Sequence, residues 1–315
     1  MFRLQVLESV DSTNEVIKRA IEDGEPEGLA IRAYRQTGGY GRQGRAWKSP
    51  RGGMYESILL RPEVEMRELP TLALVVAIAV RRALASLVVD DQARRICIKW
   101  PNDVVLVGGD FGADCSTRDI ALELGGHTPC SDSPALENSP LGCSRRAELR
   151  AAHARQAQGL QASQTNAPSI KSLYSKLAGI SSEVHAGGIC VGIGVNVEPP
   201  EDAMEVGGKN APAYLADLGF GFTCEREAAI NAVGDAVLRE FEPLYRRWCD
   251  GGFAALSGEF AEHSMLEGRF VRMANQLGEV VCEGTVRGVD ASGRLLLRLE
   301  DGETKAVASG EVHLL

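Results

Sequence analysis

The sequence lacks the long apolar run and the leader that would mark a membrane or secreted protein. Its most hydrophobic stretch, Thr71–Val80, ends at Arg81-Arg82 and is too short to span a bilayer, so we expect a buried helix there. No secretory signal is visible at the start, because polar residues interrupt the first nine positions. These absences predict a cytoplasmic protein.

Paired cysteines and excess positive charge are also missing. The eight cysteines are scattered, with no C-x-x-C pair and no Cys/His cluster at zinc spacing, which favours reduced thiols over a disulfide scaffold. The formal net charge of −9 argues against a protein that coats nucleic acid, and we expect neither DNA nor a membrane as a partner. The 315 residues, 44% of them hydrophobic, suffice for a large core and two domains.

Two short matches to nucleotide-binding motifs are misleading, and no G-x-x-x-x-G-K-[ST] phosphate loop occurs. Gly39–Gly44 satisfies G-x-G-x-x-G, but Pro50 and Gly52 follow where a dinucleotide site would need a helix. Asp110-Phe111-Gly112 matches one kinase tripeptide without the other kinase motifs. Neither match predicts a function.

Periodicity and turn residues predict mixed α and β structure. A helix is expected from Ser12 to Gly24, with Ser12 and Glu15 at the spacing of a capping box. Further helices are predicted at Leu69–Val89 and Glu225–Trp248, and strands at Leu29–Tyr34, Ser57–Arg61, Ile96–Trp100, Ile180–His185 and Gly188–Val197, with a hairpin turn at Gly187-Gly188.

Two segments differ from the rest of the chain in amino-acid composition and in hydrophobic periodicity. Residues 108–172 are rich in Ser, Ala, Gln, Asn and Pro and have little periodicity, which predicts a largely disordered insertion. Residues 268–315 alternate in short strands with turns at Asn275, Gly288, 290–293 and 301–302, typical of a small β-barrel. We therefore divide the chain into domains at 1–262 and 263–315.

Several segments are candidates for binding. The loop Gly38–Trp47 combines four glycines with Arg42 and Arg45, which suits a phosphate or acyl phosphate but equally a flexible surface turn. Lys99–Asp103 ends a strand, where functional groups are common, but by itself it fits an ordinary strand-to-turn exit better. Lys176 alone would be a solvated lysine. The strand Gly192–Asn196 lacks side chains on one face, as expected beneath a flat ligand or against a helix.

In combination these segments are specific. In chain order, Ser12-Thr13-Asn14, Gln36–Trp47, Lys99–Asp103, Lys176–Ile180 and Gly192–Asn196 resemble the signatures of the biotin–protein ligase family, S-T-N, G-R-G-R-x-G-R-x-W, K-W-P-N-D, K-x-x-G-I and G-I-G-x-N. Three departures are the replacement of the first loop arginine by Tyr40, the insertion, and the absence of a helix-turn-helix domain before residue 1, which is expected to remove any repressor function.

The resemblance implies an α+β fold: a mixed β-sheet with helices on one side, similar to class II aminoacyl-tRNA synthetases, and a C-terminal SH3-like β-barrel. It also implies the reaction. The biotin carboxylate would attack the α-phosphorus of Mg-ATP to give biotinyl-5'-AMP and pyrophosphate. A lysine of a biotin carboxyl carrier protein would then attack the acyl carbon and release AMP. The substrates are thus ATP and biotin, with Mg²⁺ expected, and a homodimer is compatible with the family.

The resemblance also assigns site residues. Lys176 and Arg42 are the expected catalytic residues, since a carboxylate and a triphosphate meet only where cations neutralise them. The expected biotin-binding residues are Ser12, Thr13, Asn14, Gln36, Thr37, Gly41, Arg42, Gln43, Lys176 and Gly179. The expected ATP-binding residues are Arg45, Trp47, Lys99, Asn102 and Asn196. Trp47 and Trp100 are expected to shield the mixed anhydride from water. No magnesium ligand can be named.

Two alternatives stay open. A lipoate or octanoate–protein ligase or transferase shares the fold and the lysine chemistry, but it carries a glycine-rich motif with a histidine, and no histidine precedes His127. A non-catalytic biotin-binding regulator is the second alternative. The retention of Lys176 and Arg42 counts against it.

Overall fold

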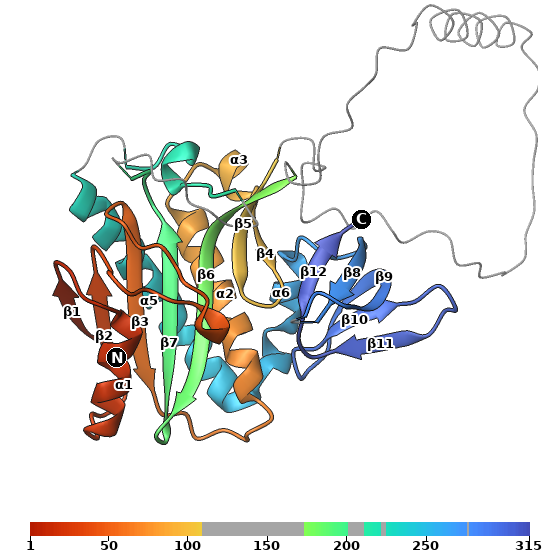
Figure 1. The fold of residues 1–315 in the computed structure, drawn as a ribbon, viewed down its shortest axis with the longest axis horizontal. Helices are drawn as coiled ribbons and strands as arrows, with labels where there is room; N and C mark the ends of the chain where they lie inside the picture. The colour runs from red at the N-terminus through yellow and green to blue at the C-terminus, as the bar shows by residue number, and fades with distance from the viewer. Residues whose placement is uncertain (109–172, 201–210, 222–224, 276) are drawn as a thin grey trace, which may run out of the picture. The chain divides into compact units, whose positions relative to one another are not determined.

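A seven-stranded mixed sheet forms the framework of the protein in the computed structural model (Figure 1). The strands lie in the order β1-β2-β3-β7-β6-β5-β4, with β1 and β2 parallel and the other neighbours antiparallel. Their bounds are Arg3–Leu7, Leu29–Ala33, Gly53–Leu60, Ile96–Lys99, Asp103–Val107, Tyr174–His185 and Gly188–Asn196 for β1 to β7. The structure describes residues 1–108, 173–200, 211–221, 225–275 and 277–315, all within one compact unit.

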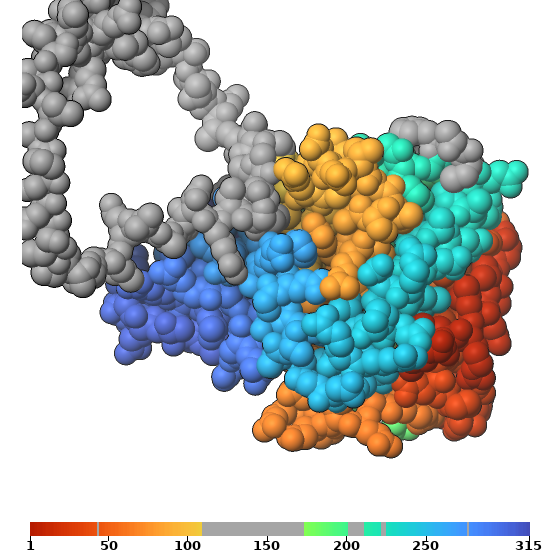
Figure 2. Space-filling view, turned by 180° about the vertical axis from the view of Figure 1, so that it is seen from behind, coloured from red at the N-terminus to blue at the C-terminus, as the bar shows by residue number. Residues whose placement is uncertain are grey.

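Helices cover both faces of this sheet, so the expectation of helices on one side is wrong. On one face, Ile17 and Ile21 of α1 (Thr13–Glu22) pack against Leu59 and Cys190. On the other lie α2 (Leu72–Ser86) and α5 (Arg226–Gly251), and Figure 2 shows α5 on the surface there. The reason is local: every residue of β2 and β3 is buried, and a strand buried on both sides needs cover on both.

The apolar segment Leu69–Ser86 is long and apolar enough to cross a membrane by length and composition, but it is a core helix here. Its side chains pack between the sheet and α5, which accounts for their hydropathy. The predicted buried helix is therefore confirmed. Shorter helices are α3 (Asp90–Ala93) and α6 (Ser257–Glu262), with 3₁₀ turns at Arg42–Gly44, Leu69–Thr71, Leu215–Leu218 and Phe253–Ala255.

Two local expectations near turns need correction. Ser12 is the N-cap of α1 but makes no side-chain capping bond, so the capping box is wrong. The hairpin between β6 and β7 turns at Ala186 and Gly187, whose φ angles are 44° and 79°, and Gly188 already belongs to β7. Two positive φ values are what a two-residue hairpin loop of type I′ requires, which moves the turn one residue towards the N-terminus.

The C-terminal residues form a separate five-stranded antiparallel sheet in the order β11-β10-β9-β8-β12. Its strands are Phe270–Ala274, Val280–Val289, Leu295–Arg298, Thr304–Val307 and Glu311–Leu314 for β8 to β12. The expected series of short strands is confirmed. The predicted turn at Gly288 is wrong: Gly288 lies inside β9 with φ 107°, next to a register shift between β9 and β10.

The predicted insertion lies outside the described residues, except for Gly108. Its described flanks are neighbours in the sheet: Val107 of β5 pairs with Tyr174 of β6, and the Gly108 amide donates to the Leu173 carbonyl at 3.0 Å. The chain therefore leaves and re-enters the sheet at one point.

A buried ion pair lies on the α5 side of the sheet. Arg32 Nε is 2.7 Å from Glu56 Oε2, and both side chains have no exposed surface. The same guanidinium reaches Asp235 Oδ1 at 2.9 Å. Burial raises the pKa of Glu56 to about 7, with Arg32 opposing the shift. Helix α5 approaches closely only because residue 234 is glycine, since a Cβ there would overlap the Arg32 guanidinium.

The cysteines only partly follow the expectation of reduced thiols. Cys190, Cys249 and Cys282 are free thiols. Cys97 is disulfide-bonded, contrary to that expectation.

Candidate functional site

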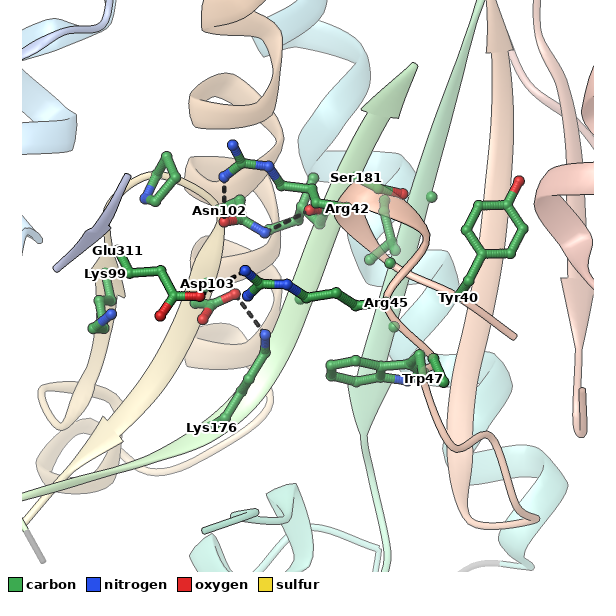
Figure 3. A pocket seen from close by; sticks show the side chains of 18 of the residues that line it. Tyr40, Arg42, Arg45, Trp47, Lys99, Asn102, Asp103, Lys176, Ser181 and Glu311 are labelled. Carbon is green, nitrogen blue, oxygen red and sulfur yellow. Dashed lines mark hydrogen bonds and ion pairs between the residues drawn. The ribbon is translucent and has the colours of Figure 1, made fainter. Parts of the chain in front are cut away.

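A cavity of about 1220 Å³ lies over the sheet face next to α1 and extends to the C-terminal sheet (Figure 3). Strands β3, β5, β6 and β7, the loop Gly38–Trp47 and the segment 309–314 all contribute to its wall. The predicted site residues that line it are Thr13, Asn14, Gln36, Gly41, Arg42, Arg45, Trp47, Lys99, Asn102, Lys176, Gly179 and Asn196. Segments spread over nearly two hundred positions of sequence are thus brought together.

The glycine-rich loop is folded as a small hairpin. Tyr40 pairs with Ala46, the Gly41 amide donates to the Arg45 carbonyl at 2.8 Å, and the Trp47 amide donates to the Gly39 carbonyl at 2.9 Å. The 3₁₀ turn Arg42–Gly44 forms the tip. The tip carries Arg42 across the cavity to the end of β4.

Both loop arginines already have partners. Arg42 Nη1 donates to Asn102 Oδ1 at 2.8 Å, and Asn102 in turn donates from Nδ2 to the Ile180 carbonyl at 2.8 Å. Burial lowers the pKa of Arg42, although a guanidinium stays charged at neutral pH. Arg45 Nη2 lies 2.6 Å from Glu311 Oε1 on β12. The loop tip is thus held between the main sheet and the C-terminal sheet.

A β-bulge in β6 turns Lys176 into the cavity. Val104 pairs with Ala178 and Val105 pairs with Lys176, so Leu177 is an extra residue in the ladder. Strict alternation would place Lys176 and Gly179 on opposite faces, because they are three residues apart. Instead Leu177 and Ala178 both enter the core, and the Lys176 ammonium lies over Gly179. Bulges commonly redirect one side chain in this way.

The Lys176 ammonium lies between a carboxylate and an aromatic ring. Its Nζ is 2.6 Å from Asp103 Oδ1 and 4.9 Å from the centre of the Trp47 ring. Both side chains of the ion pair are largely shielded, at 21% and 16% exposure. The arrangement fixes a positive charge at the edge of the cavity floor.

Lys99 is the most buried cation of the site, at 9% exposure. Burial lowers its pKa, with the charge of Asp103 opposing the shift. Its Nζ lies 5.6 Å from the centre of the Tyr174 ring, and no ion pair or hydrogen bond of this ammonium is found among the described residues. A shielded ammonium without a direct ion-pair partner attracts an anion strongly, because little water screens its charge.

The glycines of β6 and β7 form a floor, but protein side chains cover it. The indole of Trp47 lies over Gly194 and Gly179, with Nε1 3.0 Å from where a Cβ of Gly194 would stand. The side chain of Asn14 covers Gly192 from the α1 side. Trp47 Nε1 is buried and has no acceptor among the described residues. The bare strand face predicted for a flat ligand is therefore occupied by Trp47 and Asn14.

A hydrogen-bonded polar group forms the α1 end of the cavity. Gln36 Oε1 accepts from the Thr13 amide at 2.8 Å and from its hydroxyl at 3.0 Å, while Gln36 Nε2 donates to Ser49 Oγ at 2.8 Å. Ser57 Oγ lies 2.7 Å from Thr13 Oγ1 and 2.6 Å from Asn14 Oδ1. The group presents both donors and acceptors, as a ligand with amide-like N–H and C=O groups needs.

Some predicted residues do not line the cavity. Ser12 is buried beside it at the start of α1, and Thr37 is exposed, with its amide bonded to the Val10 carbonyl. Gln43 contributes backbone to the loop tip, and its side chain lies outside the described part of the chain.

Two further predicted residues line the cavity and also support the fold. Asn196 donates from Nδ2 to the Lys176 carbonyl at 3.0 Å and so supports the bulge. Trp100 lines the cavity, and its indole donates to the Gly293 carbonyl at 2.9 Å.

Sequence reasoning missed the partners of the cations. Asp103 belongs to the K-W-P-N-D segment but had no predicted role, although a carboxylate four residues after Lys99 was a usable signal. Glu311 and Tyr174 carried no signal, because only the fold brings them to the cavity, and Ser57 likewise meets the cavity residues Thr13 and Asn14 only in the fold.

Two family models match the chain. The Biotin/lipoate A/B protein ligase family matches residues 6–112, and the Biotin protein ligase C terminal domain matches residues 268–315. The first covers the loop and Lys99–Asp103, and the second covers the C-terminal sheet. The two matches contain most of the cavity wall outside β6 and β7.

Known proteins resemble the chain over all or part of its length. The Biotin--[acetyl-CoA-carboxylase] ligase of Mycobacterium tuberculosis is 24% identical over 319 residues, covering 99% of this chain and 89% of that protein. That of Paracoccus denitrificans is 36% identical over 125 residues, 39% of this chain and 48% of that protein. The biotin protein ligase of Aquifex aeolicus, solved in complex with biotin and ATP, shares the fold at TM-score 0.63 and 23% identity over 100% and 99% of the two chains. Both family models, the relative that spans the whole chain and a cationic cavity in the matched segments together support a biotin protein ligase.

Proposed function

We propose that this protein joins biotin to ATP and transfers the biotinyl group to a lysine of a biotin carboxyl carrier protein. The observation that carries the proposal is the meeting of Arg42, Lys99 and Lys176 in one cavity, with Lys99 shielded and without a direct ion-pair partner among the described residues. Such a cavity suits two anionic substrates that repel each other in water. The carrier would be that of a carboxylase, as the names of the relatives indicate.

In the first step a biotin carboxylate oxygen attacks the α-phosphorus of ATP, and pyrophosphate leaves. The Lys176 ammonium lies at the cavity floor, where it would contact both the carboxylate and the α-phosphate. Arg42 would leave Asn102 and close over the phosphate, and Lys99 would hold the triphosphate. These contacts need no rearrangement of the strands, only exchange of partners at the side-chain ends.

Biotin would lie with its ureido ring at the α1 end, where Thr13, Asn14 and Gln36 present donors and acceptors. Ser12 and Thr37 would then act from outside the cavity wall by holding α1 and the start of the loop. The indole of Trp47 would close the cavity beside the acyl phosphate and exclude water from the mixed anhydride. Arg45 and Asn196 would contribute further contacts to ATP.

In the second step the carrier lysine, deprotonated, attacks the acyl carbon. A new amide forms, the acyl–oxygen bond breaks and AMP leaves with the negative charge. Lys176 and Arg42 are placed to stabilise that charge on the departing phosphate.

Magnesium is part of this proposal as a companion of the triphosphate. The described residues contain no group of three or more His, Cys, Asp or Glu side chains that could hold a metal. The donor set therefore fits an ion carried mainly by phosphate oxygens and water, with Asp103 as a carboxylate within the cavity. Bound there, the ion would neutralise phosphate charge.

At the level of architecture, we propose that residues 1–262 are the catalytic domain, akin to class II aminoacyl-tRNA synthetases, and that 263–315 form an SH3-like barrel. The two sheets support this division. The insertion at 108–172 would be an appendage, because its described flanks already pair at Val107 and Tyr174.

The direct test is pyrophosphate release by the purified protein with biotin and ATP, followed by biotin transfer to a carrier domain. Lipoate and octanoate serve as competing substrates in the same assay. Release that depends on biotin, with transfer to the carrier, is expected. Release with lipoate or octanoate alone would favour the lipoate ligase alternative, and binding of biotin without any release would favour a non-catalytic regulator.

A further inference from the structure

Tyr40, labelled in Figure 3, stands where the family resemblance leads us to expect an arginine, and it belongs to a cluster of four side chains beside the cavity. The Tyr40 cluster consists of Tyr40 from the loop, Glu15 and Lys18 from α1, and Glu183 from β6. The Tyr40 hydroxyl donates to Glu15 Oε1 at 2.5 Å and accepts from Lys18 Nζ at 2.7 Å. Lys18 Nζ also lies 2.7 Å from Glu183 Oε2. The cluster thus connects the loop, α1 and β6.

A tyrosine suits this position better than an arginine would. The hydroxyl accepts a bond from the ammonium and donates one to the carboxylate, whereas a guanidinium has no acceptor and would repel Lys18. Burial raises the pKa of Tyr40 to about 12, so the hydroxyl keeps its proton at neutral pH. Lys18 Nζ lies 5.1 Å from the ring centre, at the hydroxyl end of the ring. The departure from the family pattern is therefore matched by its surroundings.

The cluster differs from the other attachments of the loop. The tip is held by Arg42 to Asn102 and by Arg45 to Glu311. In the proposed reaction both arginines turn to phosphate oxygens, so these two attachments are given up. Glu15, Lys18 and Glu183 take no part in that reaction. The attachment at Tyr40 therefore remains throughout the cycle.

We propose that Tyr40 is a positioning residue. Its hydroxyl fastens the N-terminal strand of the loop hairpin to α1 and, through Lys18, to β6. The loop is therefore ordered before substrates bind and stays closed over the adenylate. The fastening itself is independent of the reaction, while its effect on substrates rests on the proposed function. Loss of the fastening adds an ordering cost to each binding event, because a free glycine-rich segment must be immobilised.

Tyr40→Phe is the sharpest test, since it removes only the hydroxyl and keeps the aromatic ring. We expect KM for biotin to rise by roughly 5- to 10-fold, the effect of one hydrogen bond, while kcat for pyrophosphate release stays within about twofold. Tyr34→Phe is the matched control: it removes a hydroxyl that accepts from Asn231 Nδ2 at 2.8 Å, away from the cavity lining. It should leave KM unchanged.

Loop order is measured without any substrate, by trypsin cleavage after Arg42 and Arg45, with the fragments identified by mass. Tyr40→Phe should be cut faster at these sites than the wild type and the Tyr34→Phe control. Glu15→Ala should act like Tyr40→Phe, and the double variant should add little, because both remove the same bond. If the wild type releases no pyrophosphate, the proposed function fails and the cleavage rates still decide the fastening. Equal cleavage rates, or a lower kcat at unchanged KM, overturn the proposal.

Discussion

Lys176 provides the most direct test of the chemistry. Lys176→Ala should slow formation of the adenylate by roughly 10²- to 10³-fold, the scale for loss of one charged contact in a transition state. The structure places the ammonium over Gly179 at the cavity floor, 2.6 Å from Asp103. The carboxylate of biotin and the α-phosphate must approach each other in this cavity, and Lys176 is the cation shared between them in the proposed reaction.

The magnitude follows from what the substitution leaves behind. A loss of about 10²- to 10³-fold corresponds to about 2.7–4 kcal/mol of activation free energy. Without Lys176, the carboxylate of Asp103, which is only 16% exposed, remains unpaired and repels the incoming anions. Lys176→Ala should therefore fall at the upper end of the range. Adding Asp103→Asn should recover part of the loss, since it removes the repulsion.

The assay is single-turnover pyrophosphate release with saturating biotin and ATP. A matched control is Lys305→Ala on β11, whose ammonium lies on the surface 3.3 Å from the Val281 carbonyl and outside the cavity. It should react at the wild-type rate. Thermal melts of both variants exclude unfolding as the cause. A Lys176→Ala protein that releases pyrophosphate within about threefold of the wild-type rate would refute the assignment.

Three further outcomes are expected. Arg42→Gly should still form the adenylate but release it sooner, so biotin should appear on added albumin beyond the wild-type level; equal labelling would leave Arg42 with a role in binding alone. Replacing residues 109–172 by a short glycine-containing turn should preserve folding and biotin transfer, checked by circular dichroism and carrier labelling, and a folded but inactive product would place that segment in the site. Gly234→Ala should lower the free energy of unfolding by about 1–3 kcal/mol in a denaturant titration, because the added Cβ would overlap the buried Arg32 guanidinium. This overlap outweighs the gain of about 1 kcal/mol that alanine brings in helix propensity, and an unchanged or higher stability would contradict it.

Local sequence patterns were enough to find most elements and the segments of the site. The strands at Leu29–Ala33 and Ile96–Lys99, the buried helix α2 and the tail strands lie where periodicity predicts them. Twelve of the predicted site residues line one cavity. Periodicity and motif spacing depend only on neighbours in the chain, so they are readable without the fold.

The placement of the helices, the strand order and the contacts of Tyr40 could not be predicted from local sequence patterns. Helices on both faces of the sheet follow from which strands lie at its centre, and the order β3-β7-β6-β5 is set by pairing between distant segments. The pairing also decides that Tyr40 meets Lys18 rather than solvent.

The sequence by itself determined which residue types the site contains. These are glycines that let the backbone come close to a ligand or side chain, arginines and lysines that attract anions, and the K-W-P-N-D segment that begins at the end of β4. Only the tertiary structure decided how they face one another. Lys176 reaches the cavity because one extra residue in the β6 ladder reverses its side. Trp47 covers the glycine floor because the loop folds back on β7. A side chain's identity is local, but its direction depends on ladder register and on packing between strands that are distant in sequence.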